Sequence, residues 1–373
     1  MRAIGPAEAA VDTAATTFGS RHRIVIERAV SELRAGRPIR VSHGADARIV
    51  CSGEAVLGQW SDVRPVFASG VRLVLSQERL TYLGARVSGA ATCDLDAIVD
   101  GAVADLMLAR TVAHVPALTS ADCIEIAALD VMKFAQMVPA AVVGSPCRTL
   151  SHGWMVSVTV DDVRGYHHEV ATDLELISRA PVPLLDDADA EFVVFRGSDG
   201  LKDQVAIVVG RPNPETAVPI RLHSACLTGD LFGSLKCDCG EQLRRAIQAL
   251  AAGGGGVLLY LDQEGRGIGL SNKMHAYALQ AEGFDTVDAD AVLGYGPDER
   301  RYEIAAQMVS LLGLKRVSLM TNNPKKIAAL KAHGVEVADR IALVGTVNPH
   351  NARYLKAKTE RAGHMAEFPA DGV

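Results

Sequence analysis

Short apolar runs of strand length alternate with amphipathic stretches of helical length through the second half of the chain, and this alternation limits the folds available to it. VAIVVG (205–210), VPIRLHSA (218–225) and VLLYL (257–261) have the length and composition of buried strands. GEQLRRAIQALAA (240–252) carries apolar residues at helical spacing. Strands that alternate with helices predict an α/β domain, in which ligands bind at the loops that follow the strands.

More helices are predicted downstream. GLSNKMHAYALQAEG (269–283) ends at a glycine, and PKKIAALKAHG follows the strand RVSLMTNN. PDERRYEIAAQMVSLLG (297–313) begins with proline and two acidic residues, which helix N-termini prefer. We therefore expect Asp298 and Arg300 at the start of that helix, where backbone N–H groups bind phosphate. The loops expected to carry a ligand site are 226–240, 262–269 and 321–326.

The first half is also mixed α/β, but its pattern is less regular. RIVIERAVSELRAGRPIRV (23–41) predicts a helix, a turn and a strand, and VRLVLSQERLTYLGA (71–85) predicts a strand and then a helix. A Pro- and Asp-rich stretch, RAPVPLLDDADAEF, marks the best boundary in a chain of 373 residues, which is long enough for two cores. We predict an N-terminal domain of unassigned role over 1–195 and a catalytic domain over 196–373.

Composition excludes several classes of function. A formal net charge of −6 gives no electrostatic basis for binding nucleic acid or an anionic membrane. Apolar runs fall short of the ~20 residues of a membrane helix, and the N-terminus lacks the apolar block of a secretory signal. We therefore expect a cytoplasmic protein, whose thiols stay reduced, so that a tight cysteine cluster indicates metal binding or catalysis.

Three of the 7 cysteines lie in CLTGDLFGSLKCDCGEQL, with the spacing C-x10-C-x-C. Cys226, Cys237 and Cys239 are soft ligands suited to zinc, and three protein ligands with an open fourth position are typical of catalytic zinc, which lowers the pKa of bound water toward ~7. A structural zinc with His223 as fourth ligand and a chance cluster of free thiols are the alternatives.

Four blocks carry a family resemblance. RLHSACLTGDLFGSLKCDCGEQL, YLDQEGRGIGLSNKMHAYALQ, LGYGPDERRY and LMTNNPKK resemble, in that order, the signature blocks of GTP cyclohydrolase II, over roughly residues 200–365. The resemblance implies a GTP cyclohydrolase II-like fold for this half. It also implies one zinc per chain, a nucleotide substrate with magnesium on its phosphates, and a homodimer.

The resemblance also implies roles for individual residues. Asp298 matches the general base, Arg300 the arginine at the α-phosphate, and Tyr277 the tyrosine that supports ring opening. The zinc ligands are Cys226, Cys237 and Cys239. The positions matching nucleotide-binding residues are Arg221, Gln263, Glu264, Arg266, Thr321 and Lys326.

Several positions depart from the family pattern. Ala225 replaces a carboxylate, Asp262 replaces an arginine, and the helix that follows carries Ser271, Met274 and His275. A carboxylate is a natural partner for the N1/N2 edge of guanine. These changes question guanine as the base, whereas the residues of the predicted chemistry are retained.

The N-terminal half also bears on the substrate. Bifunctional riboflavin enzymes carry a synthase there with a conspicuous acidic block, but this chain reads SHGADARIV at that place. Synthase activity is therefore not expected, and a decayed relative of the synthase fold is the alternative. The long extension resembles the cyclohydrolase II paralogues linked to uracil catabolism.

Three hypotheses follow. The favoured one is a zinc-dependent cyclohydrolase that opens the base of a uridine nucleotide (UTP or UMP) in pyrimidine catabolism. The second is GTP cyclohydrolase II proper, which converts GTP to formate, diphosphate and a diaminopyrimidine in the riboflavin pathway. The third is a non-catalytic nucleotide-binding module with a structural zinc.

Overall fold

The chain forms two compact units, each built around its own sheet. The computed structural model describes residues 20–57, 59–96, 102–147, 153–169, 174–187, 189–197, 203–343, 345–352 and 365. The first unit comprises residues 1–170 together with 290–296, and the second comprises 171–289 and 297–373. None of the helices in these described segments has the length and apolar character needed to cross a membrane.

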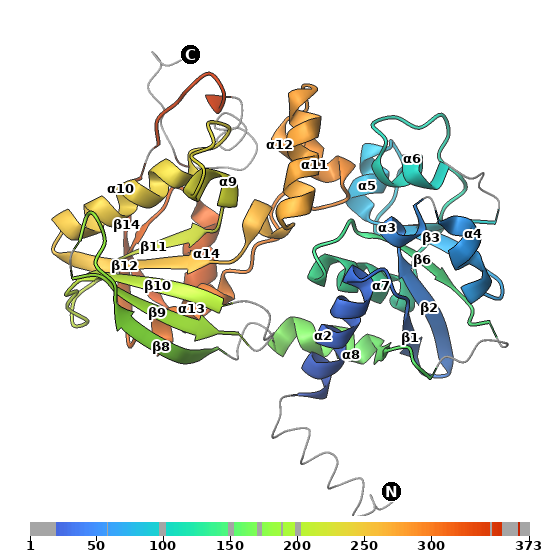
Figure 1. The fold of residues 1–373 in the computed structure, drawn as a ribbon, viewed down its shortest axis with the longest axis horizontal. Helices are drawn as coiled ribbons and strands as arrows, with labels where there is room; N and C mark the ends of the chain where they lie inside the picture. Colours follow the sequence, from blue (N-terminus) through green and yellow to red (C-terminus); the bar gives the residue numbers. More distant parts are fainter. Residues whose placement is uncertain are drawn as a thin grey trace, which may run out of the picture. The chain divides into compact units, whose positions relative to one another are not determined.

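The first unit has a mixed α/β architecture (Figure 1). Its helices are α2 (Arg21–Arg34), α3 (Gly53–Val56), α4 (Trp60–Val63), the 3-10 turn η1 (Arg64–Val66), α5 (Gln77–Tyr82), α6 (Ala102–Leu108), α7 (Cys123–Phe134) and α8 (Val160–Glu169). Its strands are β1 (Ile39–His43), β2 (Asp46–Ser52), β3 (Arg72–Leu75), β4 (Ala91–Asp94), β5 (Thr119–Ser120), β6 (Ala140–Gly144) and β7 (Ser157–Thr159). They form one sheet in the order β5-β4-β3-β6-β2-β1-β7.

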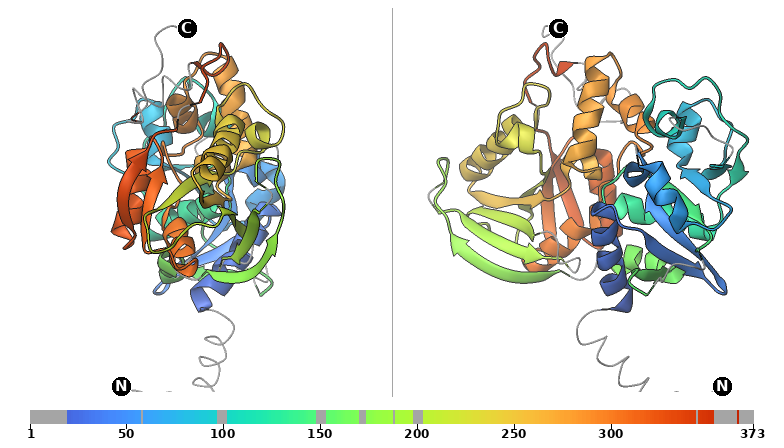
Figure 2. Two further views of the ribbon diagram at one scale, coloured as in Figure 1. Left: turned by 90° about the vertical axis from the view of Figure 1, so that its left-hand side faces the viewer. Right: turned by 45° about the vertical axis from the view of Figure 1, so that its right-hand side comes forward.

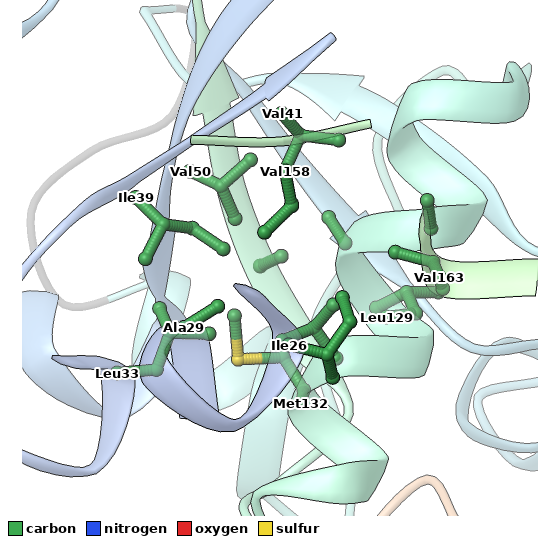
Figure 3. Close-up of a cluster of buried hydrophobic side chains, with 14 of the residues drawn as sticks. Ile26, Ala29, Leu33, Ile39, Val41, Val50, Leu129, Met132, Val158 and Val163 are labelled. Atoms are coloured by element: carbon green, nitrogen blue, oxygen red, sulfur yellow. The ribbon is translucent and has the colours of Figure 1, made fainter. Parts of the chain in front are cut away.

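Two apolar layers cover this sheet. Along β2, Val50 faces one layer while Ile49 and Cys51 face the other, as the alternation of side chains along a strand requires. The first layer packs α2, α7 and α8 onto the sheet, where Ile26 and Leu129 meet strand residues such as Val50 (Figure 3). The helix, turn and strand predicted over 23–41 are present as α2 and β1. The strand and helix predicted over 71–85 are present as β3 and α5.

The second unit holds the blocks that resemble the family, except for residues 293–296 of LGYGPDERRY, which belong to the first unit. Figures 1 and 2 show its elements. Its strands are β8 (Glu175–Pro181), β9 (Glu191–Arg196), β10 (Asp203–Gly210), β11 (Val218–Ser224), β12 (Gly255–Leu261), β13 (Arg316–Met320) and β14 (Glu336–Ile341). Its helices are α9 (Leu227–Asp230), α10 (Cys239–Ala252), the 3-10 turn η2 (Glu264–Gly267), α11 (Leu270–Ala281), α12 (Thr286–Val292), whose end belongs to the first unit, α13 (Glu303–Leu311) and α14 (Pro324–Ala332).

The sheet of the second unit positions the site loops. Its order is β14-β13-β11-β12-β10-β9-β8, and β14, β13, β11 and β12 run parallel. The helix α10 packs on one face, and α13 and α14 pack on the other. Because parallel strands end at one edge of a sheet, the segments after β11, β12 and β13 emerge together there. These are the three loops that the sequence predicts to carry a ligand site.

One predicted helix begins later than expected. The helix predicted over 297–313 begins only at Glu303, so Asp298 and Arg300 precede it. The backbone of 297–301 bonds instead to the segment after β12. Arg266 Nη1 donates to the Pro297 carbonyl at 2.9 Å, and the Glu299 N–H donates to the Arg266 carbonyl at 3.1 Å. These contacts satisfy polar groups that a first helical turn would otherwise use.

A short segment from the second half of the chain is part of the first unit. Within residues 290–296, Val292 and Tyr295 are at most 2% exposed. The guanidinium of Arg79 donates to the Val292 carbonyl at 3.0 Å, and the Ser76 hydroxyl donates to the Gly294 carbonyl at 2.7 Å. Gly294 has φ +82°, and a Cβ there would lie 2.8 Å from the Ser76 hydroxyl oxygen.

Arg79 joins this segment to the end of α6. It also donates to the carbonyls of Asp105, Leu106 and Ala109 at 2.7–2.8 Å while being only 1% exposed. Burial lowers the pKa of Arg79 to about 10, so the guanidinium stays charged at neutral pH.

We predict that Arg79→Met lowers the free energy of unfolding by at least about 3 kcal/mol, because it leaves two buried and two partly buried carbonyls without their donor. Chemical denaturation measures the change. The exposed Arg86→Met is the control, with an expected change within about 0.5 kcal/mol. Equal stability of the two variants would contradict the anchoring role of Arg79.

Candidate active site

Three cysteine sulfurs converge after β11. Cys226 precedes α9, and Cys239 is the first residue of α10. The three Sγ atoms lie within 4.8 Å of one another, and those of Cys226 and Cys237 are 3.7 Å apart. Tetrahedral ligands at the usual Zn–S distance of ~2.3 Å lie about 3.8 Å from each other. The donor set and its spacing therefore fit zinc.

Two glycines allow the sulfurs to approach. A Cβ on Gly229 would lie 2.9 Å from the Sγ of Cys237 and 3.1 Å from that of Cys226. A Cβ on Gly240 would lie 2.1 Å from the Gly229 carbonyl oxygen. The turn before α10 can therefore close around the three thiols only because neither position carries a side chain.

His223 is engaged elsewhere. Its Nε2 lies 3.1 Å from both carboxylate oxygens of Asp230, and its ring stacks on Tyr260 with the centroids 5.5 Å apart. In the described part of the chain, the group able to hold a metal ion consists of the three cysteines without His223. The alternative of a zinc closed by His223 is therefore not supported by the geometry.

A buried lysine lies beside the first cysteine. Lys273 on α11 donates from Nζ to Cys226 Sγ at 3.0 Å and to the carboxylate of Glu264 at 2.8 Å. Glu264 also accepts from the Leu227 N–H at 2.6 Å, which ties the segment after β12 to the cysteine turn. Hydrogen bonds from Cys237, together with the Lys273 ammonium, hold the pKa of the Cys226 thiol below its usual range.

Tyr277 lies one turn further along α11. The ammonium groups of Lys236 and Lys273 lie 5.0 Å and 5.4 Å from the centroid of its ring. Since Lys273 bonds Cys226, the structure places this predicted catalytic tyrosine close to the cysteine cluster. Lys273 itself was not predicted from the sequence, although its i, i+4 spacing with Tyr277 puts the two on one face of the helix.

The segment after β12 has a strained backbone. Gly265, Arg266 and Gly267 have φ values of 63°, 64° and 95°. A Cβ on Gly267 would lie 2.8 Å from the Glu299 carbonyl oxygen. With Gln263 Nε2 donating to the Arg301 carbonyl at 2.5 Å, this segment is fitted closely to 297–301. Such strain in a non-glycine residue is typical of functional sites.

Asp298, the predicted general base, pairs with Arg300, the predicted phosphate-binding residue. The Asp298 carboxylate accepts from Arg300 Nε at 2.7 Å and from Nη2 at 2.8 Å. Burial alone would raise the pKa of the Asp298 carboxyl, but the hydrogen bonds and charge of Arg300 outweigh it and hold that pKa below its usual value.

Further predicted binding residues lie within β11 and in the segment after β13. Arg221 donates to the Met320 carbonyl at 3.0 Å and to Gln242 at 2.5 Å, and burial lowers the pKa of Arg221 to about 10. Lys326 in the first turn of α14 donates to the Leu222 carbonyl at 2.8 Å.

Thr321 follows β13 and accepts from the Asn323 N–H at 3.0 Å. Gln242, which supports Arg221, was not predicted from the sequence; its position in the first turn of α10, after the cysteines, is the only signal there.

Taken with the sheet, these features define a class. An α/β domain with a three-thiol centre, and with basic residues near the ends of parallel strands, has the arrangement of a metal-dependent hydrolase.

The comparisons with known proteins agree. The family model described as GTP cyclohydrolase II matches residues 176–342. A GTP cyclohydrolase-2 from Xylella fastidiosa is 41% identical over 359 residues, covering 95% of this chain and 90% of that protein. A GTP cyclohydrolase-2 from Azospirillum brasilense is 45% identical and covers 65% of this chain and 64% of its own. The riboflavin biosynthesis protein RibBA from Bacillus subtilis is 44% identical and covers 57% and 53%.

A solved two-domain 3,4-dihydroxy-2-butanone 4-phosphate synthase from A. baumannii, RibBX, is 17% identical with a TM-score of 0.30, covering 86% of this chain and 99% of that one. A likeness at this level carries no conclusion about either unit. The chain belongs to the GTP cyclohydrolase II family and is a cyclohydrolase. The predicted fold, mixed α/β with a GTP cyclohydrolase II-like C-terminal half, is confirmed.

We predict that Gly229→Ala abolishes tight zinc binding, because the added methyl group lies within 3.1 Å of two ligand sulfurs. Metal analysis of the purified protein should fall from about one zinc per chain to near zero. The control is Gly89→Ala, where a Cβ meets nothing within 4 Å and zinc content should not change. Full zinc occupancy in Gly229→Ala would mean that the cysteines do not form the metal site.

Proposed function

We propose that this protein is a GTP cyclohydrolase II, which converts GTP to formate, diphosphate and a diaminopyrimidine. The observation that carries the proposal is the three-cysteine cluster at the strand edge that also gathers Arg221, Asp298 and Arg300. Named relatives support GTP over a uridine nucleotide. The Xylella protein called GTP cyclohydrolase-2 aligns over 95% of this chain, so the N-terminal extension does not by itself favour uracil catabolism.

Three side chains hold the metal in this proposal. Cys226, Cys237 and Cys239 would hold one zinc, which would act as a Lewis acid and lower the pKa of a bound water. Lys273 and Glu264 fix the position of Cys226 through the hydrogen bonds described above. Tyr277 lies on the same helix as Lys273 and supports ring opening from there.

The Asp298–Arg300 pair changes partners when substrate binds. A phosphate oxygen attracts the Arg300 guanidinium and competes with the Asp298 carboxylate for it. As Arg300 turns away, the pKa of Asp298 rises toward its ordinary value, because the hydrogen bonds that lowered it are lost. The carboxylate then becomes a better proton acceptor, which suits its proposed role as general base.

The remaining predicted residues complete the pocket. Arg221, Arg266 and Lys326 supply positive charge for the phosphates, and magnesium accompanies the polyphosphate, held largely by its oxygens. Gln263 and Thr321 supply polar contacts, and Glu264 acts through Lys273 and the cysteine turn. A homodimer and a cytoplasmic location are part of the same proposal.

The uridine hypothesis still has the departures from the family pattern in its favour, among them the replacement of a carboxylate by Ala225 next to Cys226. The Ala225 N–H donates to the Leu261 carbonyl at 2.7 Å, so this hydrogen bond to the last residue of β12 fixes the backbone at Ala225. A substrate assay therefore has to include both nucleotides.

We predict that zinc-loaded protein releases formate from GTP and leaves UTP unchanged. Formate detection and ultraviolet absorbance of each base measure the two reactions. Loss of uridine absorbance would restore the uridine hypothesis, and tight binding of both nucleotides without turnover would establish a non-catalytic module.

We predict that Cys237→Ser lowers kcat for GTP by at least about 100-fold, because removing a metal ligand costs more than removing an outer partner. The control is Cys123→Ser, at a half-buried cysteine in the first unit, which should keep both zinc and activity. Persistent turnover in Cys237→Ser would show that the thiol centre is not catalytic.

A further inference from the structure

Tyr302 carries a buried hydroxyl for which the described structure offers no hydrogen-bond partner. The residue precedes α13 and is 6% exposed, and its side chain does not cap the helix. Buried polar groups are nearly always paired, because leaving one unpaired costs stability. A phenylalanine would fill the same space without an unpaired polar group. We therefore look for a hydrogen-bond partner of the hydroxyl outside the folded chain.

The surroundings of Tyr302 indicate which partner it would take. The Arg300 guanidinium lies 5.3 Å and the Lys326 ammonium 5.7 Å from the centroid of its ring. The charges of Arg266 and Arg221 also act on the phenol, and the carboxylate of Asp298 opposes them. An anion that entered this group of cations would be a strong acceptor for the hydroxyl.

Other unpaired atoms occur on neighbouring residues. Arg221 Nε and Gln263 Oε1 are buried and have no hydrogen-bond partner in the described chain. Gln263 bonds the carbonyl of Arg301, the residue before Tyr302, and Arg221 lies within electrostatic range of Arg300 and Tyr302. Three segments therefore bring residues with unpaired polar atoms into the surroundings of Tyr302, as expected where a polar ligand binds.

We propose that the Tyr302 hydroxyl is a substrate contact that donates a hydrogen bond to a phosphate oxygen of the nucleotide. The proposal rests on the proposed function for the identity of the nucleotide. Arg300 and Lys326 cover the phenol in the free protein, and both are residues expected to turn toward phosphate. Their movement exposes the hydroxyl to the same phosphate group.

Tyr302→Phe tests this because it keeps the ring and both cations and removes only the hydroxyl. The melting temperature of the free protein should stay the same or rise, since an unpaired buried group has been removed. The Kd for inorganic diphosphate, measured by calorimetry, should increase about tenfold, as expected for one hydrogen bond to a charged acceptor. Binding of guanosine, which has no phosphate, should not change.

The matched control is Tyr295→Phe. The Tyr295 hydroxyl donates to the Met137 carbonyl at 2.5 Å, so removing it should lower the melting temperature and leave the Kd for diphosphate unchanged. A purely structural role for Tyr302 would give that same pattern in Tyr302→Phe and would overturn the proposal.

The outcomes also separate this proposal from the function. Equal diphosphate affinity in wild type and Tyr302→Phe, or no diphosphate binding by wild type, overturns the phosphate contact. Weaker guanosine binding by Tyr302→Phe would place the hydroxyl at the base or ribose instead and would likewise overturn it. Wild type that binds diphosphate but releases no formate from GTP overturns the proposed function and leaves the contact supported.

Discussion

The convergence of three thiol groups on one point is the constraint on which the second unit depends. The sulfurs of Cys226 and Cys237 reach 3.7 Å only because Gly229 and Gly240 leave room between the turn and the start of α10. Glu264 and Lys273 then connect this turn to the segment after β12 and to α11. The geometry of the centre therefore determines the conformation of two further segments.

Electrostatic pairing explains how the charged side chains of the site can be buried close together in the free protein. Arg300 is neutralised by Asp298, and Lys273 by Glu264, at distances of 2.7 Å and 2.8 Å. Pairs of this kind offset the desolvation of each charge, whereas a lone buried ion would destabilise the domain. Binding can then proceed by exchange of partners, which costs less than desolvating an unpaired ion.

Most of the correct predictions from the sequence rest on apolar periodicity and on the spacing of the cysteines. The strands 205–210, 218–225 and 257–261 and the helix 240–252 follow from local apolar patterns, and the metal ligands follow from cysteine spacing. The start of α13 was placed too early, because contacts with Arg266 that are distant in sequence override the local helix signal. Lys273, Gln242 and Tyr302 were missed for the same reason, since their surroundings exist only after the sheet has formed.

The position of residues 290–296 in the first unit has a consequence for synthesis. A chain that emerges from the ribosome N-terminus first has completed α2 to α8 long before Val292 and Tyr295 are available. Until then, the Val292 carbonyl that accepts a hydrogen bond from Arg79 is absent, and the buried positions of Val292 and Tyr295 are unfilled. The first unit therefore cannot complete its buried contacts until residues 290–296 have been translated, which happens after most of the catalytic unit.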